Sequence, residues 1–317
     1  MSLTVAVIMT CYNEGAYLGA AVRSVLDQSR ADLIDEIIIT DDGSDAPTLA
    51  VLREIEGWDP RIRVLFGAGG LGPAGQRRLA IAESTAPVLA ILDGDDLWTP
   101  DKLERQMLAI ADEAVGLIYS DFYIFPDGEI DAARRAGVLD ITRDTGLLRT
   151  YFLNDPPIIP STTLLRRTAY DAAGGFDAAL HVFEDTDIFL RLAAVTRFAL
   201  VNEPVLYKRQ RSTSITGGRK DLMAHHAFVA LRAAAHAPAL LPLVPRRLGE
   251  RARKLGNQRF LLNDRRGAVA LLRLAVRLDP FNRRAWQSLV AAGLFPGLAL
   301  RLLGASGRAR QAAVKLA

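Results

Sequence analysis

Two carboxylates flank a glycine at the point where an apolar run ends, about a third of the way along the chain. The run Val88–Leu92 leads directly into Asp93, Gly94 and Asp95. Such a run is typical of a buried strand, and open α/β sheets present their functional groups at the carboxyl edge. Oxygen ligands with no His or Cys nearby favour Mn²⁺ or Mg²⁺ shared with a substrate's phosphates. A polar turn before a helix capped by Thr99 explains the same residues equally well.

The first two predicted strands, Leu3–Ile8 and Ile37–Ile39, also run into polar residues. These residues are Thr10, Tyr12, Asn13, Glu14, Asp41 and Asp42. Because parallel strands end at one edge of a sheet, we expect the three polar clusters to lie together.

Glu184 and Asp185 precede an apolar pattern formed by Ile188, Leu192 and Ala193. This spacing predicts a helix that begins at the two acids. Carboxylates at a helix start usually cap it or interact with its dipole. A general base facing a cleft is the alternative.

The elements that must position these residues alternate between strand and helix. Helices are predicted at residues 16–28, 49–55, 76–84 and 102–111, and further strands at 62–66, 116–125 and 162–165. We therefore expect an α/β fold with a doubly wound, mostly parallel central sheet and flanking helices. Glycines between residues 67 and 75 predict a flexible loop.

Charge divides the chain near residue 219. Residues 219–317 hold 19 Lys and Arg against 4 Asp and Glu, whereas residues 1–218 hold 20 against 32. We expect an α/β domain over 1–218 and an all-α, basic extension over 219–317. Arginines of the segment Arg246–Lys254 predict a basic helix that contacts the inner membrane face peripherally. An arginine-rich composition inherited from the genome explains the extension equally well.

Length and composition limit the class of protein. With 317 residues, half of them hydrophobic, the chain can bury a large core. One cysteine, Cys11, excludes a disulfide framework and fits a reducing compartment. No apolar run reaches the ~18 residues of a membrane span. We expect a cytoplasmic protein, with no nucleic acid as partner.

Taken together, four motifs resemble the family 2 inverting glycosyltransferases, which have the GT-A nucleotide-diphospho-sugar transferase fold. They are Val7–Glu14, Asp41–Asp45, Leu92–Leu103, and Gly174–Asp177 followed by Glu184–Asp185. Their order and spacing cover residues 3–215. The resemblance implies transfer of a sugar from a nucleotide-diphospho-sugar donor to the hydroxyl of a sugar or lipid-linked acceptor, in cell-surface polysaccharide or glycolipid assembly.

The resemblance also assigns roles to single residues. Thr10, Tyr12 and Glu14 would line the nucleotide pocket, Asp42 would contact the nucleobase, and Arg77 would face the nucleotide. Asp93 and Asp95 match the DxD pair: Asp93 would contact ribose or a metal-bound water, and Asp95 would be the direct ligand of Mn²⁺ or Mg²⁺. Asp185 matches the catalytic base.

Further contacts to the diphosphate or acceptor are expected from Glu184, Arg209 and Arg211. The two arginines lie in the basic segment Tyr207–Ser212, where exposed strand-end arginines are the plain alternative. Two other functional classes stay open: a Mg²⁺-dependent nucleotidyl- or phosphoryl-transfer enzyme, and a non-catalytic scaffold that binds nucleotide-sugars.

Overall fold

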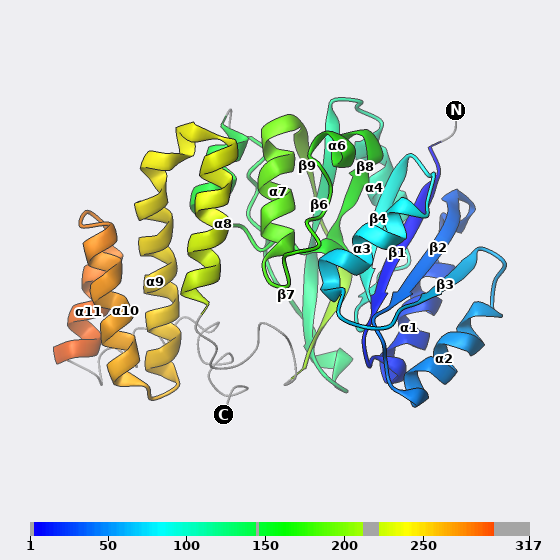
Figure 1. Ribbon diagram of the computed structural model, residues 1–317, viewed down its shortest axis with the longest axis horizontal. Helices are drawn as coiled ribbons and strands as arrows, with labels where there is room; N and C mark the ends of the chain where they lie inside the picture. Colours follow the sequence, from blue (N-terminus) through cyan, green and yellow to red (C-terminus); the bar gives the residue numbers. More distant parts are fainter. Residues whose placement is uncertain (1–2, 144–145, 212–221, 295–317) are drawn as a thin grey trace. The chain divides into compact units, whose positions relative to one another are not determined.

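The computed structural model describes residues 3–143, 146–211 and 222–294 (Figure 1). The strands are β1 (Val5–Cys11), β2 (Ile34–Asp41), β3 (Ile62–Phe66), β4 (Val88–Asp93), β5 (Leu97–Trp98), β6 (Val115–Pro126), β7 (Arg134–Arg135), β8 (Leu164–Arg166) and β9 (Arg197–Gln210). The α-helices are α1 (Gly15–Leu26), α2 (Ala46–Glu56), α3 (Gly72–Ala82), α4 (Lys102–Ile110), α5 (Leu147–Asn154), α6 (Arg167–Ala172), α7 (Glu184–Val195), α8 (Met223–His236), α9 (Val244–Leu261), α10 (Arg265–Leu278) and α11 (Arg283–Leu294).

The strands form one mixed sheet in the order β3-β2-β1-β4-β8-β6-β9-β5, with β7 paired to β6. The four strands from β3 to β4 are parallel, and their connections are helices, as the alternating pattern predicts. Beyond β4 the sheet becomes mixed, because β8 inserts antiparallel between β4 and β6. The doubly wound α/β sheet is therefore confirmed, and the parallel pairing belongs chiefly to its first half.

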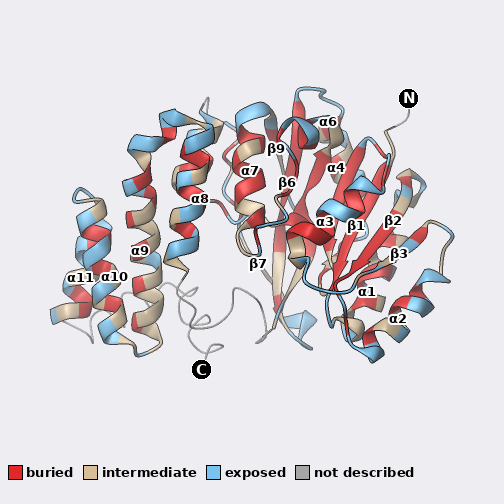
Figure 2. Cartoon of the chain, viewed as in Figure 1, coloured by how far each residue is buried: buried red, intermediate tan, exposed pale blue. Residues whose placement is uncertain are grey.

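Burial explains why β1 and β4 lie at the centre of the sheet. All seven residues of β1 are buried, and so are the first five of β4 (Figure 2). Strands covered by helices on both faces read as continuous apolar runs rather than alternating ones. The polar residues at the ends of these strands are thereby held at one edge of a rigid core.

The glycine-rich stretch before α3 is more ordered than the sequence predicts. Helix α3 begins at Gly72, inside the expected flexible loop. The Asp42 carboxylate accepts hydrogen bonds from the backbone amides of Leu71 and Gly72, both at 2.8 Å. Gly69, Gly70 and Gly72 have positive φ, which a residue with a Cβ adopts at a cost. Asp42 therefore fixes the start of this helix.

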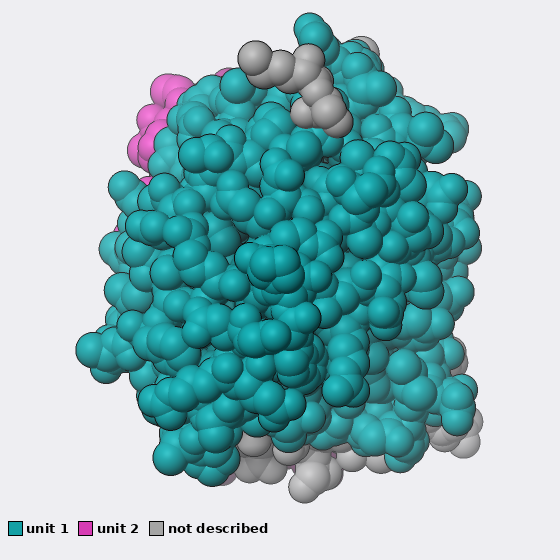
Figure 3. All heavy atoms as spheres, turned by 90° about the vertical axis from the view of Figure 1, so that its right-hand side faces the viewer, with its two compact units in different colours: residues 1–151, 155–210 teal, residues 152–154, 211–317 magenta. Residues whose placement is uncertain are grey.

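The chain divides into two compact units, coloured in Figure 3. Unit 1 comprises residues 1–151 and 155–210, and unit 2 comprises residues 152–154 and 211–317. The predicted boundary between residues 218 and 219 lies outside the described residues. The expected C-terminal all-helical region is present as α8–α11.

The prediction that the basic residues of α9 form a surface is wrong for Arg247, which is buried. Arg247 is only 2% exposed and donates to the Phe152 carbonyl oxygen. Arg253 forms an ion pair with Glu250 at 2.6 Å, while Arg246 and Lys254 are exposed. Helix α9 packs against both α10 and α11, so part of its basic side serves the interior of unit 2. Among the helices that the structure describes, none has the length and apolar character needed to cross a bilayer.

Candidate functional site

The register of the central strands brings the first polar clusters together. Thr10 lies beside Asp93 across the β1–β4 pairing, and the Gly94 amide donates to the Thr10 carbonyl oxygen at 3.2 Å. A Cβ at Gly94 would lie 2.7 Å from Glu14 Oε2 and 2.9 Å from that carbonyl oxygen. The glycine is thus required because the strand ends approach closely. Tyr12, from the same cluster, is 59% exposed.

A buried arginine joins the acidic turn after β4 to the helix that begins at Glu184. Arg77 is 3% exposed and donates to Asp93 Oδ1 at 2.7 Å and to Glu184 Oε1 at 2.8 Å. Its guanidinium also lies over the ring of Phe176, 5.6 Å from the centroid. Two acids 91 positions apart in the sequence therefore share one cation. A role as helix cap alone does not account for Glu184, because its side chain forms this ion pair with Arg77.

The same arginine affects the ionisation of Asp93. Burial opposes ionisation of the carboxyl, but the charges of Arg77 and Lys208 outweigh burial and hold the pKa of Asp93 below its usual value. Asp93 is therefore a carboxylate at neutral pH.

Asp185 has the properties expected of a general base. Its Oδ1 accepts from the Thr186 amide at 2.6 Å, which holds the carboxyl at the first turn of α7. Burial and the neighbouring charge of Glu184 raise the pKa of Asp185 to about 6, against the opposing effects of Thr186 and Arg77. A carboxyl with a pKa near the operating pH accepts a proton more readily than an ordinary aspartate. Phe183, which precedes α7, has a left-handed backbone with φ of 60°. Such a conformation is rare for an aromatic residue and is found at functional turns.

Two charged side chains at this edge received no individual role from the sequence. Lys208 on β9 lies within the electrostatic reach of Asp96, Asp93, Asp95 and Asp185, whose charges raise its pKa although burial lowers it. Burial and the charges of Asp95 and Asp93 raise the pKa of Asp96 to about 7, although Lys208 opposes them. Asp96 directly follows the DxD pair, which was the available signal. Lys208 lies in the basic segment Tyr207–Ser212, but its place beside the aspartates depends on the pairing of β9 with β5 and β6.

Arg209 braces the acidic turn. Its amide donates to Asp96 Oδ1 and its Nε to the Asp95 carbonyl oxygen, both at 3.0 Å. Its guanidinium forms an ion pair with Asp127 at 2.9 Å and lies over the rings of Tyr17 and Phe125. These contacts hold the turn after β4 against β9. A contact between Arg209 and a diphosphate stays a prediction, as does the role of Arg211, which belongs to unit 2.

The donor set fits a divalent cation only if the substrate completes its coordination. Among residues 3–143, 146–211 and 222–294, no three His, Cys, Asp or Glu side chains are arranged to hold a metal ion. Asp93 accepts from Arg77 at 2.7 Å, and Asp95 is the other acid of the DxD pair. Mg²⁺ is commonly bound by one or two carboxylates together with substrate phosphates and water. These two acids fit that pattern.

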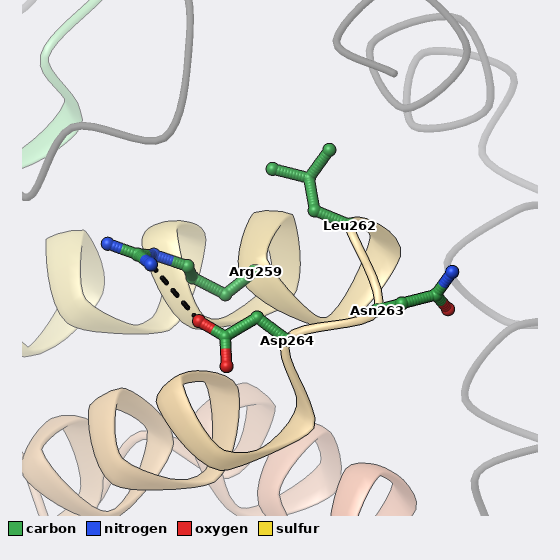
Figure 4. A pocket seen from close by; sticks show the side chains of 4 residues that line it. All are labelled: Arg259, Leu262, Asn263 and Asp264. Carbon is green, nitrogen blue, oxygen red and sulfur yellow. Dashed lines mark hydrogen bonds and ion pairs between the residues drawn. The ribbon is translucent and has the colours of Figure 1, made fainter.

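A separate hollow in unit 2 carries no comparable chemistry. It measures about 210 Å³ and is lined by Arg259, Leu262, Asn263 and Asp264 at the turn between α9 and α10 (Figure 4). Asp264 caps α10 through the Gly267 amide at 2.9 Å and pairs with Arg259 at 3.0 Å. These polar groups stabilise the turn, which explains why they gather there.

Comparison with known proteins decides the family. A family model described as Glycosyl transferase family 2 matches residues 6–174, more than half of the chain. The chain belongs to glycosyl transferase family 2. The match ends before Glu184, so the placement of Glu184, Asp185 and Lys208 beside the family 2 segment rests on the geometry described above.

Several named relatives of this family 2 chain are glycosyltransferases. The putative teichuronic acid biosynthesis glycosyltransferase TuaG of Bacillus subtilis is 40% identical over 103 residues, 32% of this chain and 40% of that protein. The UDP-Glc:alpha-D-GlcNAc-diphosphoundecaprenol beta-1,3-glucosyltransferase WfgD of Escherichia coli is 32% identical over 126 residues, 40% of this chain and 48% of that protein. These matches span less than half the length of either relative.

Solved structures share the fold. The crystal structure of S. aureus TarS 1–349 in complex with UDP-GlcNAc superposes with a TM-score of 0.62 at 17% identity, covering 96% of this chain and 91% of that one. At such low identity the likeness establishes the GT-A fold and no more.

Proposed function

We propose that this family 2 chain is an inverting glycosyltransferase that moves a sugar from a nucleotide-diphospho-sugar to an acceptor hydroxyl. The observation that carries the proposal is the bridge from Asp93 through Arg77 to Glu184, and it supports a shared site for the DxD pair and the candidate base Asp185, which directly follows Glu184. Charges of Lys208 act on both Asp93 and Asp185, which supports the same proximity.

The acceptor side of the reaction requires a proton acceptor. As the hydroxyl attacks the anomeric carbon, Asp185 takes its proton, and the pKa of about 6 keeps Asp185 ionised at neutral pH yet basic enough to do so. Attack from the face opposite the leaving group inverts the anomeric configuration, by the logic of single-displacement glycosidases. One carboxylate base is sufficient, and no second nucleophile is needed.

The donor side requires positive charge at the departing diphosphate. Asp95 and Asp93 would hold Mn²⁺ or Mg²⁺, and the bound cation would supply Lewis-acid stabilisation of the leaving oxygens. Thr10, Tyr12, Glu14 and Asp42 are the proposed nucleotide contacts, and Arg209 and Arg211 are proposed to reach the diphosphate. The Lys208 ammonium is a further protein cation at the same edge. The acceptor is proposed to be a sugar or lipid-linked carrier, in polysaccharide or glycolipid assembly.

The test is product analysis with UDP-, GDP- and dTDP-sugars and divalent cations, comparing the natural protein with Asp185→Asn. We expect the variant to bind the donor with unchanged affinity in calorimetry and to lose transfer by at least ~100-fold. Asp187→Asn is not a suitable control, because Asp187 pairs with Arg191 at 2.6 Å. Asp171→Asn, at an exposed acid of α6, is the matched control. Near-normal turnover in Asp185→Asn would rule out Asp185 as the base.

The remaining functional classes give different outcomes in the same experiment. A nucleotidyl- or phosphoryl-transfer enzyme would release a nucleotide product without a glycosylated acceptor in mass spectrometry. A non-catalytic scaffold would bind nucleoside diphosphate, and neither variant would change the products.

A further inference from the structure

One helix of unit 2 leaves an apolar stripe exposed to solvent. We define the α11 face as Phe281, Arg283, Trp286, Val290 and Leu294. Phe281 is 93% exposed, Leu294 71%, Trp286 48% and Val290 46%. Trp286, Val290 and Leu294 follow one another at intervals of four positions, which places them on one side of a helix with 3.6 residues per turn. Singly exposed apolar side chains are common, but an aligned stripe indicates an interaction surface.

The opposite side of α11 is fully used by the interior of unit 2. Ala285 packs with Ala252 and Ala275, and Ala292 belongs to a cluster with Phe260 and Leu272. The Arg265 side chain donates to the carbonyl oxygens of Ala292 and Gly293 and so fixes the end of the helix. Helix α11 is therefore firmly seated on its small-residue side, and the exposed stripe cannot turn inward without unseating that packing.

Positive charge is concentrated in α10 and α11, the helix pair that carries the stripe. From residue 265 to residue 294 the chain holds six arginines and one acid, Asp279. Arg277, Arg283 and Arg284 are exposed, and within the described part of the chain none of them forms an ion pair. Exposed residues recur along the outward sides of α10 and α11 in Figure 2. The surface thus combines a cationic field with large apolar groups.

We propose that the α11 face docks on an anionic phospholipid surface. A helix lying in a membrane interface inserts Trp, Phe and Leu among the acyl chains while its basic residues meet the head groups. A second copy of this chain is disfavoured as the occupant, because the arginines of two copies would repel each other. Phe281 and Trp286 offer nucleic acid a stacking surface, but Val290 and Leu294 offer it neither stacking nor hydrogen bonds, so it is the less favoured occupant and an outcome of the test. The proposal places the attachment on α11 rather than on α9, where the sequence predicts it.

The experiment is flotation of the full-length protein with two kinds of vesicle, pure phosphatidylcholine and phosphatidylcholine mixed with phosphatidylglycerol. We expect binding to the anionic vesicles only. Arg283→Gln combined with Arg284→Gln should reduce the vesicle partition coefficient by about tenfold or more, since each basic residue near an anionic surface contributes a factor of about five. The double variant Arg30→Gln with Arg63→Gln is the control, because it removes equal charge from exposed positions of unit 1. It should bind vesicles nearly as well as the natural protein.

A second pair of variants tests how much the apolar side chains contribute to vesicle binding. Leu294→Gln should weaken binding several-fold, whereas Leu108→Gln, at an 80% exposed leucine of unit 1, should not. Trp286 emission should shift to the blue on binding, and the shift should be missing in Trp286→Phe. Circular dichroism of each variant checks that the helices remain folded.

A photocrosslinking residue at position 290 identifies the occupant directly. Capture of phospholipid supports the proposal. Capture of a second copy, or of residues 295–317 of the same chain, overturns it. Equal binding to neutral vesicles, tighter binding to nucleic acid, or loss of binding only in the unit 1 controls would overturn it as well. None of these results depends on transfer activity.

Discussion

Replacing Arg77 by methionine should destabilise unit 1 by about 3–5 kcal/mol at neutral pH, the usual cost of removing one partner of a buried ion pair. The magnitude follows from the burial of Arg77, 3% exposed, and from its contacts with Asp93 at 2.7 Å and Glu184 at 2.8 Å. Methionine keeps much of the apolar volume beside Phe176 but leaves both carboxylates without this cation. The cost arises from the stranded charges rather than from lost packing.

Unfolding in urea, followed by tryptophan fluorescence, measures this cost. A Trp286→Phe background leaves Trp58 and Trp98, which both lie in unit 1, as reporters. The matched control is Arg78→Met, at the next arginine of α3. Arg78 is exposed, with a 3.4 Å contact to the Phe176 carbonyl oxygen. We expect the control to change the free energy of unfolding by less than ~0.5 kcal/mol.

A double-mutant cycle separates the two ion pairs. Adding Glu184→Gln to Arg77→Met removes one stranded charge, so the double variant should be more stable than Arg77→Met alone, with a coupling of about 1–3 kcal/mol. If Arg77→Met lay within ~1 kcal/mol of the natural protein, or if the coupling vanished, the bridge would not be an energetic link between β4 and α7.

Three further outcomes are expected. The value of kcat/KM should fall below about pH 6, because Asp185, whose pKa is raised to about 6, becomes protonated there and can no longer act as the base. Arg77→Met should shift this decrease in kcat/KM to higher pH, since the Arg77 charge lowers the pKa of Asp185. A pH profile that is flat down to pH 5 would contradict the assignment of Asp185. If Asp95 is the proposed Mn²⁺ ligand, Asp95→Ala should abolish any increase in nucleoside diphosphate affinity that Mn²⁺ causes in calorimetry, and an undiminished Mn²⁺ effect would exclude Asp95 as a ligand. Gly94→Ala should destabilise unit 1 by about 1–3 kcal/mol through the clash with Glu14 and Thr10, whereas Gly293→Ala, where a Cβ meets nothing within 4 Å, should not destabilise unit 2 in thermal melts.

Local patterns predicted the elements that carry the first acids. Continuous apolar runs marked β1 and β4 because both strands are buried on two faces, and the acids after them could only lie at the sheet edge. The start of α7 at Glu184 was likewise predicted from a short apolar pattern. Residues 129–155 gave no readable pattern, and the structure places β7 and α5 there. The two-residue strand and the eight-residue helix are too short for periodicity to identify.

The sequence could not predict which individual basic residues of α9 are exposed and which are buried. Arg246 and Arg247 are neighbours in the same helix, yet the first is exposed and the second is buried against Phe152. Which arginine of α9 turns inward depends on where α8, α10 and α11 pack, and composition contains no such information.

The sequence by itself determined which chemical groups this protein has and that acids follow two strands at one edge of the sheet. It could do so because buried strands and helices are recognised from the pattern of apolar residues close together in the chain. Only the tertiary structure decided which charges act on one another: Arg77 between Asp93 and Glu184, and Lys208 among the aspartates. The physical reason is that charges interact through space, and the mixed half of the sheet, which sets those distances, forms by pairing between segments far apart in the chain.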